Sequence, residues 1–101
     1  FFIDRNENLY VNEIAPRVHN SGHLTINAYN ISQFENHVRA VCKLEQIPLK
    51  KISNAMMKNI IGDQIVYYRN KEFNENEFFF DYLKKEIKQK RKMGHLTTLL
   101  N

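Results

Sequence analysis

Short apolar runs alternate with polar turns in the first quarter of the chain, a pattern typical of a β-hairpin followed by a loop. Residues 1–4 are mostly apolar, residues 5–8 read Arg-Asn-Glu-Asn, and residues 9–15 are rich in aromatic and β-branched side chains. Two apolar runs around a polar tetrapeptide predict antiparallel strands. Residues 16–23 follow neither the helical nor the strand period and contain Pro, Asn, Ser and Gly, so we predict a loop there.

The next stretch predicts a helix. Residues 32–35 read Ser-Gln-Phe-Glu and fit a capping box, in which the serine caps the first turn and the glutamate reaches back. Phe34, Val38 and Val41 then follow at the spacing of one helical face. We therefore predict an amphipathic helix over residues 32–44.

The pattern of the following residues is less decisive. Residues 52–61 form an apolar run that stops at Gly62-Asp63, and period alone does not choose between helix and strand. Residues 65–68, Ile-Val-Tyr-Tyr, are typical of a strand. Residues 70–77 are polar and predict a loop.

Two alternatives remain open near the C-terminus. Residues 78–85 predict either a strand or the start of a helix that continues to Lys92. Gly94 interrupts the pattern, and residues 95–100 predict a last strand.

Cys42 is interpreted as a small buried group of the predicted helix rather than a reactive thiol.

Met56 and Met57 are interpreted as core residues rather than cofactor contacts.

Composition limits the class of protein. The chain has 101 residues, 43% hydrophobic and 26% charged, as in a soluble globular protein with one modest core. It has no apolar run long enough to span a membrane, and a single cysteine excludes an internal disulfide.

Positive charge is concentrated near the C-terminus. The formal net charge is +4, and residues 84–92 hold six basic side chains against one acidic side chain. Such a patch is either a solvated surface or a binding site for phosphate groups. Stacking on single-stranded nucleic acid would require aromatic residues between the basic ones. Here Phe78, Phe79 and Phe80 precede them in a block, which is more typical of a core strand.

Candidate chemistry lies in the hairpin and the loop. Glu13, beside Asn12, offers oxygen ligands of the kind that magnesium prefers together with substrate phosphates. His19 and His23 have the spacing of two zinc ligands on a helix, but Asn-Ser-Gly between them argues against a helix and no third ligand is evident. Ser21 lacks the Gly-x-Ser-x-Gly turn of a serine nucleophile.

Three motifs in order carry a resemblance to a known family. Residues 12–23 read Asn-Glu-Ile-Ala-Pro-Arg-Val-His-Asn-Ser-Gly-His, residues 31–35 read Ile-Ser-Gln-Phe-Glu, and residues 91–95 read Arg-Lys-Met-Gly-His. With them the chain closely resembles 5-(carboxyamino)imidazole ribonucleotide synthase, the ATPase subunit of bacterial phosphoribosylaminoimidazole carboxylase, of the ATP-grasp superfamily. The resemblance extends over residues 1–100 and corresponds to the C-terminal segment of that family.

The resemblance implies a fold and an activity. The fold would be α+β, with residues 1–45 as the C-terminal end of an ATP-grasp domain (β-hairpin, loop and amphipathic helix) and residues 46–101 as a small β-rich domain. It favours strands over residues 78–85 and 92–99. Members use ATP, magnesium and bicarbonate to carboxylate 5-aminoimidazole ribonucleotide in purine biosynthesis, through carboxyphosphate. They are cytoplasmic ligases and usually homodimers.

The resemblance also implies roles for individual residues. Glu13 would bind magnesium, and Asn12 would lie at the ATP phosphates. The bicarbonate and imidazole side of the site would be lined by Arg17, His19, Asn20 and Ser21, with Arg17 and His19 as catalytic residues. An arginine there can stabilise developing negative charge, and a histidine can hold or relay a proton. Lys85 and Arg91 would bind the phosphate of the ribonucleotide.

The chain departs from the family pattern at two places. A Pro-Gly turn that usually precedes the tail arginine is replaced by Gln89-Lys90, and the Leu-Pro-Leu-Gly after the helix by residues 47–50, Ile-Pro-Leu-Lys. The ATP-grasp portion upstream would be a necessary partner, so we expect no ATPase activity from this segment alone. Two alternatives are a basic module that binds nucleic acid non-specifically and an inactive remnant of the ligase.

Overall fold

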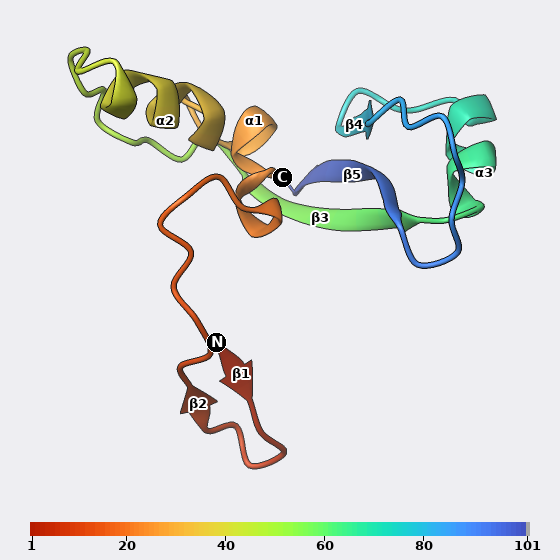
Figure 1. Cartoon of the computed structure of the whole chain (residues 1–101), viewed down its shortest axis with the longest axis horizontal. Helices are drawn as coiled ribbons and strands as arrows, with labels where there is room; N and C mark the ends of the chain where they lie inside the picture. The colour runs from red at the N-terminus through yellow and green to blue at the C-terminus, as the bar shows by residue number, and fades with distance from the viewer. Residues whose placement is uncertain (101) are drawn as a thin grey trace.

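The computed structural model describes residues 1–100 and has an α+β fold, as predicted (Figure 1). The N-terminal part contains β1 (Phe2–Ile3), β2 (Leu9–Tyr10), the 3₁₀ turn η1 (Asn20–Gly22), α1 (Thr25–Ala28) and α2 (Gln33–Val41). The C-terminal part contains β3 (Asn54–Ile61), α3 (Gln64–Asn70), β4 (Glu77–Asp81) and β5 (Lys92–Leu100).

The predicted β-hairpin forms, but it is shorter than its apolar pattern suggests. Strands β1 and β2 pair antiparallel, with Phe2 opposite Tyr10, and residues 11–15 continue as irregular chain. The Asp4 carboxylate closes the turn by accepting the backbone N–H groups of Asn6 and Asn8 at 2.8 and 2.9 Å. A side-chain hydrogen bond from Asn8 is the main reason why the pKa of Asp4 is lowered. Figure 1 shows the hairpin standing apart from the other elements.

Helix α2 begins as predicted, with the Ser32 hydroxyl accepting the Glu35 backbone N–H at 3.2 Å. The reciprocal half of the capping box is replaced by an ion pair, because the Glu35 carboxylate accepts from Arg39 at 2.9 Å. The helix ends at Val41, before the predicted Leu44, and Lys43 adopts a left-handed φ of 54°. A residue in that conformation is a common way to terminate a helix.

The apolar face of α2 is exposed. Phe34, Val38 and Val41 are 41%, 54% and 68% exposed, so the amphipathic pattern is present but this face is only partly covered, by the His23 ring that stacks on Phe34. The prediction that Cys42 is a buried group is wrong, because the residue lies just past the helix end and is exposed.

A three-stranded antiparallel sheet of order β3-β5-β4 forms the C-terminal part. The ambiguous run 52–61 is therefore a strand, with Met57 opposite Thr97 of the central strand β5. Met56 points away from the core and is 62% exposed, so its interpretation as a core residue is wrong, while Met57 is half-buried.

The last two strands are those that the family resemblance implies, and β5 (Lys92–Leu100) agrees with the implied strand over residues 92–99, whereas the pattern alone predicted other bounds. Strand β4 ends at Asp81, and residues 82–91 form a loop rather than the continuation of a strand or helix. Strand β5 runs through Gly94 instead of starting after it. A Cβ atom at Gly94 would lie 2.5 Å from the Phe80 carbonyl oxygen, so the glycine lets β5 approach β4 closely.

Residues 65–68 form part of helix α3, and the prediction of a strand is wrong there. Gly62, at a φ of 55°, turns the chain out of β3, and Ile65 and Tyr68 then face the sheet one helical turn apart. β-Branched and aromatic side chains favour strands by composition, but here burial against the sheet decides the conformation.

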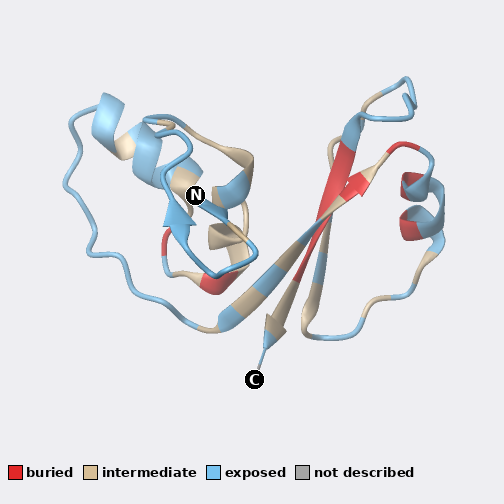
Figure 2. Cartoon of the chain, turned by 90° about the horizontal axis from the view of Figure 1, so that it is seen from below, coloured by how far each residue is buried: buried red, intermediate tan, exposed pale blue. Residues whose placement is uncertain are grey.

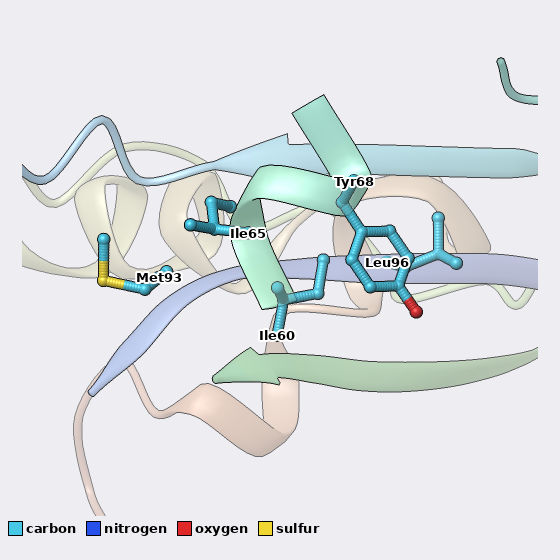
Figure 3. Close-up of a cluster of buried hydrophobic side chains, with 5 residues drawn as sticks. All are labelled: Ile60, Ile65, Tyr68, Met93 and Leu96. Carbon is cyan, nitrogen blue, oxygen red and sulfur yellow. The ribbon is translucent and has the colours of Figure 1, made fainter. Parts of the chain in front are cut away.

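The hydrophobic core lies between α3 and the sheet. It consists of Ile60, Ile65, Tyr68, Met93 and Leu96 (Figure 3). Phe73 and Phe79 pack against its edge, with ring centroids 5.3 Å apart. Figure 2 shows that most of the buried residues lie in this sheet and helix, whereas the N-terminal part is largely exposed. No helix within residues 1–100 is long and apolar enough to cross a bilayer.

Candidate functional site

A cavity of about 300 Å³ lies where the chain leaves the hairpin and enters the predicted loop. Its walls include Asn12, Glu13, His19 and Ser21, four of the residues singled out from the sequence. The irregular segment 11–17 folds back toward η1, so that Glu13 and His19 meet across the cavity. The structure thus brings together the candidate magnesium ligand and part of the candidate bicarbonate side.

The His19 ring is held in one orientation by its neighbours. Its Nδ1 accepts the backbone N–H of Ser21 at 3.3 Å and lies 2.9 Å from the Ser21 hydroxyl oxygen. In the neutral ring this contact leaves the proton on Nε2. That atom lies 4.0 Å from Oε1 of Glu13. The arrangement presents a hydrogen-bond donor and a carboxylate to the same cavity.

Asn20 joins the loop to the C-terminal sheet. Its side-chain N–H donates to Oδ1 of Asn59 on β3 at 2.8 Å, and its Oδ1 accepts from Nζ of Lys92 on β5 at 3.0 Å. Asn20 and Asn59 are partly buried, so these bonds hold η1 against the sheet rather than in solvent. A binding residue predicted from the motif therefore also connects the two parts of the molecule.

A second cluster of ring side chains lies beside Asn20. The His23 ring stacks on Phe34 of α2 and approaches His95 of β5, with both centroid distances 5.3 Å. His95 is 1% exposed, its Nδ1 lies 2.9 Å from the Tyr82 hydroxyl, and its Nε2 has no hydrogen-bond partner within residues 1–100. Phe80 also stacks on His95, with ring centroids 5.4 Å apart.

Burial controls the protonation of this ring cluster. It lowers the pKa of His95 to about 4, and the neighbouring His23 acts in the same direction. Burial also lowers the pKa of His23, with smaller contributions from the charges of Lys92 and His19. Burial raises the pKa of Tyr82. The His23 and His95 rings are therefore neutral at pH 7, and they act as packing and hydrogen-bonding groups rather than as cations.

The remaining predicted residues lie outside this cavity. Arg17 lines a neighbouring cavity of about 270 Å³ against α2, where its Nη1 donates to the Val18 carbonyl at 3.2 Å. Lys85 and Arg91 lie exposed in the loop between β4 and β5 and line neither cavity. Lys92, which follows Arg91, does reach the site through its contact with Asn20. The basic loop and η1 are therefore adjacent at Lys92.

The residues at the wall of this cavity fit part of a magnesium site rather than a complete one. Within residues 1–100, no group of three or more His, Cys, Asp or Glu side chains could hold a metal ion. Glu13 and Asn12 supply a carboxylate and an amide oxygen at the cavity wall. Magnesium commonly takes one or two protein carboxylates and completes its shell with phosphates and water, so this donor set fits that ion as a partial ligand set.

Some residues of the site were not singled out from the sequence. Gln33, at the start of α2, bonds to the backbone of His19, and Tyr82, Lys92 and His95 hold the loop from the sheet side. Three of them lie within the quoted motifs, which is the signal that could have found them. Tyr82 has no such signal, because its position beside His95 arises from the pairing of β4 with β5.

Comparison with known proteins accounts for nearly the whole chain. The family model of the ATP-grasp domain matches residues 1–34, and that of the phosphoribosylaminoimidazole carboxylase C-terminal domain matches residues 55–101. N5-carboxyaminoimidazole ribonucleotide synthase of Staphylococcus aureus (strain COL) is 47% identical over 105 residues. The match covers 100% of this chain and 28% of that protein, so the chain spans little more than a quarter of its relative's length.

Solved structures show the same correspondence. The N5-carboxyaminoimidazole synthetase of Staphylococcus aureus complexed with ADP superposes with a TM-score of 0.85 at 45% identity, covering 100% of this chain and 28% of that one. The Aspergillus clavatus synthase in complex with ADP and 5-aminoimidazole ribonucleotide gives 0.83 at 34% identity, covering 98% and 28%. The chain therefore matches the C-terminal segment of the N5-carboxyaminoimidazole ribonucleotide synthases from end to end, which confirms the family resemblance predicted from its motifs.

Proposed function

We propose that this chain is the C-terminal part of a ligase that uses ATP and bicarbonate to carboxylate 5-aminoimidazole ribonucleotide. The product is 5-(carboxyamino)imidazole ribonucleotide, an intermediate of purine biosynthesis, and carboxyphosphate carries the activated carboxyl group. The observation that carries the proposal is the cavity shared by Asn12, Glu13, His19 and Ser21, in a chain that matches such synthases over its whole length.

His19 and Arg17 act on the bicarbonate side. Because Nδ1 of His19 accepts from Ser21, the neutral ring keeps its proton on Nε2 and donates a hydrogen bond into the cavity. A donor there stabilises the negative charge of bicarbonate and of the carboxyl group during transfer. Arg17 contributes a permanent positive charge from the neighbouring cavity, and Asn20 and Ser21 fix the orientation of the loop.

Glu13 and Asn12 act on the ATP side. A magnesium ion held there would neutralise charge on the phosphates of ATP, and its remaining protein ligands would come from the upstream portion of the enzyme. Glu13 is well exposed, so its carboxylate is available to an ion and to a neighbouring domain. ATP binding itself requires that upstream portion.

Lys85 and Arg91 bind the phosphate of the ribonucleotide. Both side chains are exposed in the basic loop that follows β4, and the Lys92 side chain connects that loop to Asn20. An arginine can bind two phosphate oxygens through its planar guanidinium group. The loop thus attracts the phosphate while η1 faces the imidazole and bicarbonate.

The domain boundary and the assembly belong to the same proposal. Residues 1–45 complete an ATP-grasp domain, and residues 46–101 form the small β-rich domain. This division is supported by the hydrophobic cluster of Ile60, Ile65, Tyr68, Met93 and Leu96, all of whose members lie in the second range. The complete enzyme is a cytoplasmic homodimer, as is usual in the family that the sequence resembles.

The test is carboxylation by the complete enzyme that carries this segment. Purified enzyme is incubated with ATP, magnesium, ¹⁴C-bicarbonate and 5-aminoimidazole ribonucleotide. We expect ADP and acid-labile labelled product in equal amounts, both dependent on the ribonucleotide. Release of ADP without incorporation of label, or without any need for the ribonucleotide, would refute the proposal.

A further inference from the structure

Gln33, the first residue of α2, uses its whole side-chain amide to hold the loop that carries His19. Its Oε1 accepts the His19 backbone N–H at 2.9 Å, and its Nε2 donates to the His19 carbonyl at 2.7 Å. The same Nε2 lies 2.7 Å from Nδ1 of His23. The amide therefore binds residue 19 as the backbone of a neighbouring strand would, and both of its N–H groups are used.

The main chain of Gln33 is fixed to the same loop. Its backbone N–H donates to the Thr25 hydroxyl oxygen at 2.8 Å, and that hydroxyl donates to the Gly22 carbonyl at 2.6 Å. The first N–H groups of a helix have no intrahelical acceptor, so this bond replaces no hydrogen bond within α2. One residue thus joins the helix to the loop through both its main chain and its side chain.

Gly22 provides the space in which the Gln33 amide lies. A Cβ atom at residue 22 would come within 2.5 Å of Oε1 and 2.8 Å of Cδ of Gln33. Contacts that short require the amide to move. The glycine in the loop and the glutamine on the helix therefore depend on each other, although eleven positions separate them in the sequence.

We propose that Gln33 is a positioning residue for His19 in the carboxylation reaction, an inference that rests on the proposed function. The Ser21 contacts fix the His19 ring, and the Gln33 amide fixes the backbone from which that ring projects. Together they fix the position of the His19 ring, whose Nε2 lies 4.0 Å from Oε1 of Glu13. A displacement of about 1 Å at a reacting group can lower the rate about 100-fold.

The first test is Gln33→Glu in the complete enzyme. The new carboxylate can still accept the His19 N–H, but it loses both donors and turns a negative oxygen toward the His19 carbonyl. We expect kcat to fall about 100-fold while the KM for ATP changes less than about twofold. Gln46→Glu, at an exposed glutamine outside the site, is the matched control and should retain the parental kcat. An unchanged kcat in Gln33→Glu, or a loss confined to KM, would overturn the proposal.

A second pair of variants guards against simple misfolding. Gly22→Ala should displace the Gln33 amide and lower kcat at least about tenfold. In a Gln33→Ala background the space is already free, so adding Gly22→Ala should lower kcat by less than about twofold more. Additive losses from the two substitutions would show that Gly22 and Gln33 act independently, and would refute the mutual dependence.

Histidine-ring NMR gives a readout that does not depend on turnover. In ¹⁵N-labelled complete protein, Gln33→Glu should shift the ring nitrogen signals of both His19 and His23, and Gln46→Glu should leave them in place. If the parent enzyme fails to carboxylate the ribonucleotide, the proposed function is wrong. The NMR comparison of the two variants still tests the contacts of Gln33 with His19 and His23. Unshifted ring signals in Gln33→Glu would overturn the positioning role itself.

Discussion

The two parts of the molecule differ in where their apolar side chains lie. In the C-terminal sheet, Ile60 and Met93 are fully buried under α3. In the N-terminal part, Ile14 is 86% exposed and Val41 is 68% exposed. The C-terminal part therefore has a core of its own, whereas the hairpin and α2 present surfaces of the kind that other protein normally covers.

This difference agrees with the distribution of the chemistry. The predicted ATP-side residues Asn12 and Glu13 lie in the poorly covered part, and the loop 19–23 is held to the sheet through Asn20 and His23. The chain covers 28% of its Staphylococcus aureus relative, and the ATP-grasp family model matches residues 1–34. In our proposal, the upstream portion covers the exposed surfaces and completes the site at Glu13.

The largest expected effect is functional and arises in the exposed part. In the complete enzyme, Glu13→Gln should lower ADP release by about 100-fold or more, because the carboxylate that we propose as a magnesium ligand becomes a neutral amide. Glu7→Gln, at an exposed glutamate in the hairpin turn, should retain the parental rate. Steady-state assays of ADP release compare the two variants, and equal rates would show that Glu13 has no role in the site.

The second prediction concerns stability and compares the same residue type in two environments. Met93 is 0% exposed and Met56 is 62% exposed. Met93→Ala should lower the free energy of unfolding of the chain by about 2–5 kcal/mol, since it leaves a cavity in the core. Met56→Ala should change it by less than about 0.5 kcal/mol. Urea unfolding checks both, and similar losses would mean that the sheet has no distinct core.

The third prediction concerns the contact between the two parts and depends on pH. Burial lowers the pKa of His95 in the folded chain to about 4 from an ordinary value of 6.5. The unfolded state therefore takes up the proton first as pH falls, so stability is full above pH 6.5 and is lost toward pH 4. The loss amounts to about 3 kcal/mol.

Unfolding free energies at pH 7 and pH 4.5 measure this effect. His95→Gln should reduce the acid-dependent loss, whereas His37→Gln, at an exposed histidine of α2, should leave it unchanged. If both variants lose as much stability as the parent between the two pH values, His95 is not the group responsible.

The smallest expected effect concerns substrate binding by the basic loop. Arg91→Ala in the complete enzyme should raise the KM for the ribonucleotide, corresponding to a loss of about 1–3 kcal/mol for a charged hydrogen bond. Arg5→Ala removes the same charge from the exposed hairpin turn and should leave that KM unchanged. Kinetics indistinguishable between the two variants would refute the phosphate assignment.

Local signals were sufficient to predict much of the fold. The capping serine and the spacing of Phe34, Val38 and Val41 predict α2, and the polar tetrapeptide predicts the hairpin turn. Composition misled at residues 65–68, because the choice of a helix there depends on burial against a sheet formed by residues far along the chain. The prediction for Cys42 was wrong because the residue lies just past the end of α2, where it is exposed.

The site was predictable as a set of residues but not as an arrangement. Motifs named Glu13, His19 and Ser21, and the structure adds that they share one cavity. The roles of Gln33 and His95 depend on contacts across 14 and 72 positions, which no local pattern encodes. The separate position of Arg17 likewise follows from the way α2 packs on the loop.

We propose that the chain supplies the carboxylation side of a ligase site and, through Asn12 and Glu13, only part of its ATP side. The most direct test of this proposal is ADP release from the isolated chain and from the complete enzyme, each with ATP, magnesium, bicarbonate and 5-aminoimidazole ribonucleotide. We expect ribonucleotide-dependent ADP release from the complete enzyme and none above background from the isolated chain. Robust ribonucleotide-dependent release from the isolated chain would contradict it.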